Sequence, residues 1–278
     1  MNNINIFLEH IYEACSQRGI TQEKMLTEAR DMGYTGLECD LWRLSGSDVR
    51  AMFQRCGMNI ASVYARFDFA HESNELSAEK MKFCLDTAAY FGADKVLAIP
   101  GFIRQGENHT DVCGRICEGL SEMCTLACSY GITVMLEDFD DISAPYSTSA
   151  GLEYFMRNTD GLKYAFDTGN FAYSLESADK AYDILRPWIV HSHLKDRSRD
   201  VSRISVDGGN AKADLGGDMM YPCETGGGYI GVETLVKRML HDGYTGDFSV
   251  EHFGAVNQTV YMKRSIENIT KWIKEAQL

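Results

Sequence analysis

The sequence predicts a (β/α)₈ barrel formed by the whole chain, residues 1–278, and three observations support this prediction. Eight short segments rich in Val, Ile, Leu and aromatic residues alternate with longer amphipathic segments, as in a parallel sheet covered by helices. A chain of 278 residues is long enough for one barrel domain, and no linker divides it. The first short segment runs into FLEHIYEACS, which lacks the glycine-rich turn of a dinucleotide-binding open sheet.

Each short segment has the length and composition of a buried strand. The predicted strands are Ile4–Phe7, Gly36–Leu41, Asn59–Phe67, Lys95–Pro100, Thr133–Phe139, Leu162–Asp167, Ile189–Leu194 and Asp247–Phe253. The predicted helices are Thr21–Met32, Ser47–Cys56, Ser77–Phe91, Thr110–Tyr130, Thr148–Asn158, Ser177–Leu185, Val232–His241 and Gln258–Glu275. Five of these helices open on a residue that commonly caps a helix, namely Thr21, Ser47, Ser77, Thr148 and Ser177.

One long segment, residues 197–229, interrupts this alternation after the seventh predicted strand. It contains seven glycines and shows no clear strand or helix pattern. A loop of this length inside a compact domain is commonly a lid or a wall of a functional site. We therefore expect it to lie at or over an active site.

The composition excludes several classes of function. Twenty-seven basic and 40 acidic residues give a net charge of −13, which disfavours binding to nucleic acid or to an anionic membrane surface. The N-terminus lacks the features of a signal peptide, and no segment is apolar enough to span a bilayer. The nine cysteines then indicate reduced thiols and a cytoplasmic protein. The oligomeric state stays open, a homo-oligomer included.

Four consecutive late strands end in side chains that bind metal ions well. The candidates are Glu137 in TVMLED, Asp167 in KYAFDTGN, His193 in IVHSHLKD and Glu251 in DFSVEHF. The carboxyl ends of barrel strands meet at one mouth, where barrel enzymes have their active sites. The four side chains are therefore expected to converge there.

Side-chain alternation supports this convergence, because neighbours on a strand point to opposite faces. If the four candidates point inward, Leu136, Phe166, Ser192 and Val250 point to the helices, as do Val134, Tyr164, Val190 and Phe248 one pair earlier. Seven of these eight are apolar or aromatic. The inward residues below the candidates are Met135, Ala165, His191 and Ser249.

Three converging carboxylates raise one another's pKa values unless a cation neutralises them. Three carboxylate oxygens and one imidazole nitrogen suit a single Mn²⁺, Mg²⁺, Co²⁺ or Zn²⁺ ion with positions left for substrate oxygens. The sequence does not select among these metals.

This layout resembles the xylose isomerase-like TIM-barrel superfamily of sugar phosphate isomerases and epimerases, with their inosose dehydratase and ketose 3-epimerase relatives. The resemblance runs from GYTGLE at 33–38 to the last strand and is most specific in FDTGN, HSHLKD and SVEHF. It implies that Glu137, Asp167, His193 and Glu251 bind the metal, and that the two glutamates act as acid and base. It also implies that Arg199, six residues after His193, grips the substrate.

Further residues are candidate substrate contacts, and each has a structural alternative. Asn170, three residues after Asp167, stands where related enzymes often have a histidine, and an amide binds a substrate hydroxyl better than a metal. Lys195 and Asp196 follow the metal histidine and either bind substrate or form a surface ion pair. Glu38 either reaches the substrate or pairs with cations inside the barrel.

The predicted activity is that of a metal-dependent sugar isomerase or epimerase that removes a proton next to a carbonyl through an enediolate, on a sugar or polyol substrate. Loss of a β-hydroxyl or cleavage of a keto-sugar on the same site would make it a dehydratase or a lyase. A DNA-repair endonuclease of this fold is a further alternative. It needs three metals, and Asn170 and Gly209 stand where two of its histidines are expected, although His71 and His109 lie after earlier strands.

Overall fold

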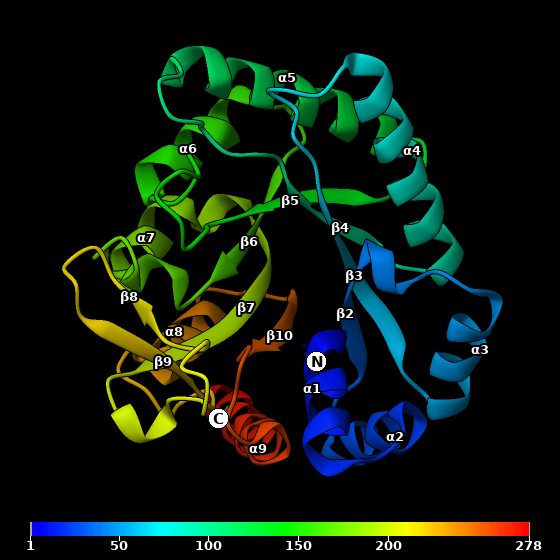
Figure 1. Cartoon of the computed structure of the whole chain (residues 1–278), viewed down its shortest axis with the longest axis vertical. Coiled ribbons are helices and arrows are strands. Elements are labelled where there is room, and N and C mark those ends of the chain that lie inside the picture. The colour runs from blue at the N-terminus through cyan, green and yellow to red at the C-terminus, as the bar shows by residue number, and fades with distance from the viewer. Residues whose placement is uncertain (1, 278) are drawn as a thin grey trace.

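Eight parallel strands close into a barrel in the computed structural model, which describes residues 2–277 (Figure 1). The strands are β1 (Ile4–Phe7), β2 (Gly36–Asp40), β3 (Asn59–Arg66), β4 (Lys95–Ile99), β5 (Thr133–Glu137), β6 (Lys163–Asp167), β7 (Ile189–Ser198) and β10 (Asp247–Glu251). β10 closes the barrel by pairing with β1 on one side and with β7 on the other. All eight predicted strands and the predicted (β/α)₈ barrel are therefore confirmed.

Nine α-helices in the described residues surround the barrel. They are α1 (Leu8–Arg18), α2 (Gln22–Met32), α3 (Ser47–Cys56), α4 (Asn74–Phe91), α5 (His109–Cys128), α6 (Ser149–Asn158), α7 (Ala178–Leu185), α8 (Val232–His241) and α9 (Gln258–Ala276). None of those described is both long and apolar enough to cross a bilayer.

One helix, α1, is not predicted by the sequence pattern, because the usual start signal of a helix is absent there. α1 follows β1 without a loop, and Phe7 occupies the cap position with no side-chain hydrogen bond to the helix. Its buried residues Leu8, Ile11 and Ala14 recur at the spacing of one helix face, and Gly19 ends it with a φ of 63°. This spacing was the signal that could have revealed α1.

The predicted helix caps are confirmed in part. Thr21 and Thr148 accept hydrogen bonds from Lys24 N and Gly151 N. Ser177 stands at the cap of α7 without such a bond. The prediction of a cap at Ser77 is wrong, because α4 starts earlier and is capped by Ser73. The prediction at Ser47 is wrong as well, because Ser47 is the first residue of α3 and Gly46 occupies the cap position.

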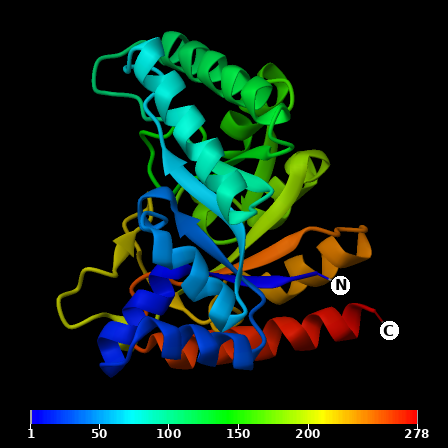
Figure 2. The same cartoon turned by 90° about the vertical axis from the view of Figure 1, so that its right-hand side faces the viewer.

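The predicted irregular segment is partly ordered into an extension of the barrel wall. β7 continues to Ser198, and the short strand β9 (Met219–Cys223) pairs antiparallel with its end. β8 (Lys212–Ala213) pairs with β9, and the 3₁₀ helix η4 (Val201–Arg203) precedes it. Figure 2 shows this yellow segment at one end of the molecule and both chain termini at the other.

The barrel has two apolar regions, as the alternation predicts. Leu136, Tyr164, Phe166, Phe248 and Val250 belong to the large core between strands and helices. Leu97, Met135 and Ala165 form a small separate cluster inside the barrel. Val190 is the exception, since a register shift between β6 and β7 places it against the inner cluster. All nine cysteines are free thiols.

Candidate metal centre and active site

The four predicted metal ligands come together at the carboxyl end of the barrel. Ligand atoms of Glu137, Asp167, His193 and Glu251 all lie within 4.8 Å of one another. Asp167, His193 and Ser249 are neighbours in register, whereas Glu251 pairs with Lys195, two residues further along both strands. The two glutamates thus stand on β5 and β10, on either side of β6 and β7.

The imidazole of His193 is oriented by two carboxylates. Its Nδ1 lies 2.5 Å from Glu137 Oε1 and 3.6 Å from Glu251 Oε2. Its Nε2 lies 3.1 Å from each carboxylate oxygen of Glu38, which is fully buried. Because the ionised Glu38 carboxylate only accepts hydrogen bonds, Nε2 carries a proton and Nδ1 faces the cluster.

Asp167 presents one oxygen to the cluster and uses the other to shape its own turn. Oδ1 accepts hydrogen bonds from Gly169 N at 2.6 Å and from Asn170 N at 2.8 Å. Oδ2 is buried and has no hydrogen-bond partner among the described residues. Its nearest cation is Lys195, whose Nζ lies 3.3 Å away. A buried carboxylate oxygen without a donor is expected where a cation is to bind.

Lys195 stands at the upper edge of the cluster. Its Nζ donates to Asn170 Oδ1 at 2.8 Å and forms an ion pair with Glu251. Asn170 is held in turn by a hydrogen bond from its Nδ2 to Asp138 O at 2.8 Å. Burial lowers the pKa of Lys195, but Asp167 and Glu251 outweigh this effect and raise it, so the side chain is an ammonium ion.

Crowding of the carboxylates makes their ionisation unfavourable when no cation is bound. Burial, Asp167 and Glu137 raise the pKa of Glu251 to about 8, although Lys195 opposes this shift. Burial is also the largest cause that raises the pKa of Glu137. The pKa of His193 would fall through burial, but Glu38 and Glu137 raise it well above its usual value. A divalent cation removes this penalty by favouring the ionised carboxylates.

The donor set therefore fits a hard or borderline divalent cation. Three carboxylates and one imidazole are typical ligands of Mg²⁺, Mn²⁺, Co²⁺ and Zn²⁺. A second acidic and imidazole group, formed by Glu38, His191 and His193, lies deeper in the barrel. There His191 Nε2 contacts Glu38 Oε2 at 3.0 Å and Ser249 Oγ at 2.9 Å. This deeper group is accounted for by hydrogen bonds that support His193.

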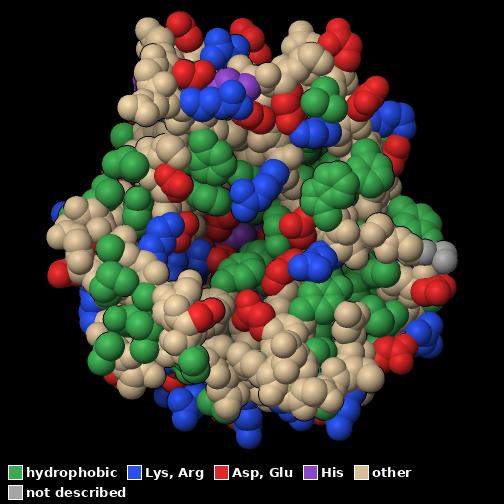
Figure 3. All heavy atoms as spheres, in the orientation of Figure 1, with side chains coloured by type: hydrophobic (Ala, Val, Ile, Leu, Met, Phe, Trp, Pro, Cys, Tyr) green, Lys and Arg blue, Asp and Glu red, His purple; other side chains and the backbone are tan. Residues whose placement is uncertain are grey.

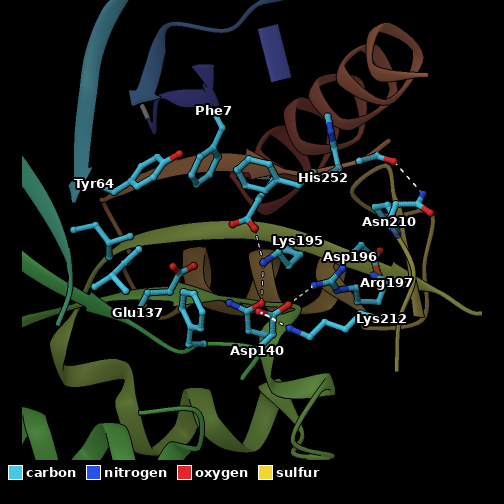
Figure 4. Close-up of a pocket in the computed structure, with 18 of the residues that line it drawn as sticks. Phe7, Tyr64, Glu137, Asp140, Lys195, Asp196, Arg197, Asn210, Lys212 and His252 are labelled. Carbon is cyan, nitrogen blue, oxygen red and sulfur yellow. Dashed lines mark hydrogen bonds and ion pairs between the residues drawn. The ribbon is translucent and has the colours of Figure 1, made fainter. Parts of the chain in front are cut away.

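A cavity of about 530 Å³ opens above the cluster. Figure 3 shows the hollow at the centre of this face, with acidic side chains at its depth and basic ones around it. Glu137, Lys195 and Glu251 lie on its floor, and the apolar walls include Phe7 and Phe139. Gly209, Asn210, Ala211 and Lys212 of the long segment also line it, and Figure 4 labels Asn210 and Lys212 among the lining residues. The predicted position of the long segment at the site is thus confirmed.

The structure separates the predicted substrate contacts into two groups. Lys195 and Asn170 line the cavity. Glu38 does not, because it is fully buried beneath His193. Arg199 does not either, since it is turned outward to an ion pair with Asp214 at 2.7 Å and to the ring of Tyr229. These two predicted contacts are placed away from the cavity.

Asp196 borders the cavity, but its carboxylate is used inside the protein. Oδ1 accepts from Arg197 N at 2.8 Å and Ile230 N at 3.2 Å. Oδ2 accepts from Gly226 N and Gly228 N, both at 3.0 Å. Four backbone donors thus occupy both oxygens and hold the adjoining loop, and a substrate contact at Asp196 stays a prediction.

Several cavity residues were not predicted, namely Arg66, Asp140, Arg197 and Lys212. Arg197 had a signal in the sequence, because His193, Lys195 and Arg197 alternate and share one face of a strand. The predicted strand ended at Leu194, which hid this pattern. The others lie at strand ends or in the long segment, where periodicity gives no information.

The two histidines considered for a three-metal nuclease do not join the cluster. His71 is bound to Asp68 Oδ1 at 2.6 Å and to Glu107 Oε1 at 2.8 Å. His109 Nδ1 lies 3.5 Å from Cys113 Sγ at the start of α5. Neither belongs to the groups that could hold a metal ion among residues 2–277.

Comparison with known proteins agrees with this architecture. The family model described as xylose isomerase-like TIM barrel matches residues 26–276. A sequence comparison with curated proteins yields no match.

Solved structures show the same fold at low sequence identity. A probable 3-DHS dehydratase from Bacillus anthracis is 16% identical with a TM-score of 0.74, covering 96% of this chain and 98% of that one. An L-ribulose 3-epimerase is 15% identical with a TM-score of 0.74, covering 100% and 96% of the two chains. A Mycobacterium smegmatis protein in complex with magnesium is 20% identical with a TM-score of 0.69, covering 92% and 89%.

Proposed function

Because the chain belongs to the xylose isomerase-like TIM-barrel family, we propose that it is a metal-dependent isomerase or epimerase of a sugar or polyol. One observation carries this proposal. Ligand atoms of three carboxylates and one imidazole lie within 4.8 Å of one another, and two of these carboxylates, Glu137 and Glu251, also line a cavity of about 530 Å³. The family includes epimerases of similar fold, such as the L-ribulose 3-epimerase.

Glu137, Asp167, His193 and Glu251 would hold one divalent cation. When bound, such an ion polarises a carbonyl and stabilises negative charge that develops on adjacent oxygens. The magnesium complex named for one protein of similar fold is consistent with a hard cation. The choice among Mg²⁺, Mn²⁺, Co²⁺ and Zn²⁺ stays open.

We assign the proton transfer to the two glutamates. Glu137 on β5 and Glu251 on β10 border the cavity from strands separated by β6 and β7, so they approach a ligand from different sides. One carboxylate removes the proton from the carbon next to the carbonyl, which gives an enediolate. Return of the proton to the opposite face by the other carboxylate gives an epimer. Return to the neighbouring carbon gives an isomer.

Asn170 and Lys195 orient the substrate in this scheme. The Lys195 ammonium lies between Glu251 and Asn170 at the cavity floor and has hydrogen atoms to donate to a substrate hydroxyl. Phe7, Phe139 and the segment that carries Asn210 cover the ligand and limit access of water.

A dehydratase or lyase is the second candidate, and Lys195 is the observation that favours it. The buried ammonium beside Glu251 is within reach of a substrate hydroxyl, and a charge-assisted hydrogen bond from it stabilises the negative charge that develops when the hydroxyl leaves. A probable 3-DHS dehydratase is among the proteins of similar fold, which supports this candidate.

Proton exchange with solvent tests both candidates with one readout. Protein loaded with Mn²⁺ is incubated in D₂O with a panel of ketoses, inosose and keto-glycosides, and deuterium at the carbon next to the carbonyl is measured by NMR. Glu251→Gln should lower exchange about 10²–10⁴-fold if Glu251 is the base. Exposed Glu79→Gln on α4 is the matched control and should exchange at the normal rate. Exchange absent from every substrate, or unchanged in both Glu251→Gln and Glu137→Gln, would contradict the proposal.

A further inference from the structure

One part of the cavity wall carries charges that the proposed proton transfer does not use. Asp140 follows β5 and stands between two cations (Figure 4). Its Oδ2 lies 3.1 Å from Arg197 Nη2, and its Oδ1 lies 3.1 Å from Lys212 Nζ. One carboxylate thus pairs with two cations, and the group keeps one excess positive charge.

This excess stands out in a chain whose net charge is −13. Arg66 lines the same cavity, and no carboxylate within the described part of the chain comes within 4.0 Å of its guanidinium. Apart from Asp140 and the proposed metal ligands, two acids line the wall: Asp40, whose Oδ1 accepts a hydrogen bond from Trp42 N, and Asp196, whose oxygens accept four backbone hydrogen bonds. Away from the floor, three cations stand against three acids, but Asp140 is the only one of these acids in the described residues that forms an ion pair with a cation.

Arg197 is not fully satisfied in this arrangement. Its side chain is only 10% exposed, and its Nε is buried without a hydrogen-bond partner among residues 2–277. A buried guanidinium N–H without an acceptor is unfavourable, and its planar donors match a carboxylate or phosphate in particular. Lys212 is 38% exposed, so its ammonium remains accessible from the cavity.

We propose that Arg197 and Lys212 form an anion subsite and that the substrate carries a carboxylate or a phosphate group. This inference rests on the proposed function and narrows its substrate class. The anionic group binds beside Asp140, where it balances the excess charge and supplies acceptors for the guanidinium and the ammonium. A neutral sugar lacks such a group, so Arg197 and Lys212 gain no additional anionic partner when it binds.

The spacing along β7 indicates where the anionic group sits on the substrate. His193, Lys195 and Arg197 alternate along the strand and face the same interior. Arg197 lies four residues beyond His193, which is about 13 Å along a strand. The anionic group is therefore at the far end of the chain from the reacting carbonyl.

A set of three sugars with the same carbon chain tests this substrate class. D-fructose, D-fructuronate and D-fructose 6-phosphate differ at the far end, which is neutral, a carboxylate or a phosphate. Their dissociation constants for the Mn²⁺-loaded protein are measured by calorimetry. We expect at least one of the two anionic sugars to bind about tenfold or more tightly than D-fructose. Comparison of D-fructuronate with D-fructose 6-phosphate then shows whether the subsite prefers a carboxylate or a phosphate. Binding of D-fructose as tight as that of both anions overturns the subsite, whereas solvent exchange still tests the proposed function separately.

Variants locate the subsite. Lys212→Gln should weaken binding of the preferred anion about 10–100-fold and leave binding of D-fructose unchanged. Arg66→Gln removes the same charge on β3, on the opposite side of the barrel. Exposed Arg115→Gln on α5 is the control outside the cavity. Loss of anion preference in Arg66→Gln, and not in Lys212→Gln, would overturn the assignment to Arg197 and Lys212.

Titration without a sugar keeps the test independent of the substrate panel. Inorganic phosphate and acetate are titrated into the metal-free protein, so that neither anion can bind through a metal. At least one should bind to the wild type and bind about tenfold more weakly to Lys212→Gln. Equal binding of both probes to wild type and variant, or no binding to either, would contradict the subsite.

Discussion

Single side chains decide whether this site holds a cation, and His193 is the clearest case. An imidazole binds a metal only through a nitrogen that carries no proton. Glu38, fully buried below, accepts a hydrogen bond from Nε2 and thereby turns Nδ1 toward the carboxylates. The sequence left two roles open for Glu38, a substrate contact or a pairing with cations inside the barrel, and its contacts with His191 and His193 correspond to the second. The particular partner was not predictable, because Glu38 on β2 is far along the chain from His193.

Glu38→Gln tests this positioning role. The amide weakens the acceptor for the Nε2 proton, so we expect metal affinity to fall about 10–100-fold. Calorimetric titration of Mn²⁺ measures the change, and the pH dependence of the affinity should shift with it because the imidazole loses its carboxylate partner. Glu79→Gln, exposed on α4, is the control. Equal affinities in the three proteins would show that Glu38 does not position His193.

Two further buried histidines, His10 and His252, give a prediction for the pH dependence of stability. His10 and His252 stack with ring centroids 4.6 Å apart and are both buried. Burial lowers the pKa of His252 to about 4, and it lowers that of His10 well below its usual value. Since the folded-state pKa is depressed, the unfolded chain binds more protons below about pH 6.5. The associated stability is present above that pH and is lost as the pH falls toward 4.

His252→Phe keeps a stacked ring and removes the titration. Between pH 7 and pH 5, the wild type should lose about 2 kcal/mol more free energy of unfolding than this variant, as measured with urea. His241→Gln, whose side chain is 89% exposed, should behave as the wild type. Parallel pH profiles of the wild type and His252→Phe would refute a neutral buried His252.

Among the secondary-structure elements, β7 organises the site. It carries His193, Lys195 and Arg197 on its inner face, and its extended end pairs with β9. Sequence patterns located the strand but ended it at Leu194, because the polar residues after it look like a loop. The pairing that makes them a strand comes from residues 219–223, which no local pattern connects to β7. The candidate ligands were predicted because all four stand at strand ends of equal parity.

The loop after β9 depends on one carboxylate of β7. Asp196 accepts four backbone N–H groups, those of Arg197, Gly226, Gly228 and Ile230. The loop is packed so closely that a Cβ on Gly228 would lie 2.2 Å from Arg197 O. Asp196 therefore holds the wall of the cavity in place.

Asp196→Asn should destabilise the protein, because the amide NH₂ group replaces an oxygen that accepts hydrogen bonds and leaves two backbone N–H groups facing a donor. We expect a loss of about 1.5–3 kcal/mol, read as a lower midpoint in urea or a lower Tm. Asp160→Asn, exposed in the turn before β6, is the matched control. A variant as stable as the control would show that the four hydrogen bonds contribute little.

The complete barrel explains why residues far apart in sequence form one site. Closure by β10 between β1 and β7 brings Glu251 to His193 and places both beside residues of β5 and β6. The fold was predictable because the apolar segments alternate regularly over the whole chain. The cavity wall was less predictable, since Arg66, Asp140 and Lys212 come from strand ends and from the long segment. Their positions follow from three-dimensional closure and not from local periodicity.

The net charge of the molecule also predicts what it does not bind. At −13, the surface as a whole repels a phosphate backbone, and the basic side chains of the cavity are few and enclosed. Fluorescence anisotropy with an abasic-site duplex at physiological salt should show no measurable binding. Cleavage of that duplex by metal-loaded protein, together with no action on any sugar, would favour the endonuclease alternative.

The number of metal ions per chain tests the proposed site most directly. The protein is stripped of metal with a chelator, reloaded with Mn²⁺ and freed of excess metal. Its metal content is then measured by inductively coupled plasma mass spectrometry. We predict one ion per chain in the wild type and a large loss in Asp167→Asn, whose Oδ2 is the buried oxygen without a donor. Asp160→Asn should retain the ion. Wild type without bound metal, or Asp167→Asn with the same content, would contradict a metal centre at Glu137, Asp167, His193 and Glu251.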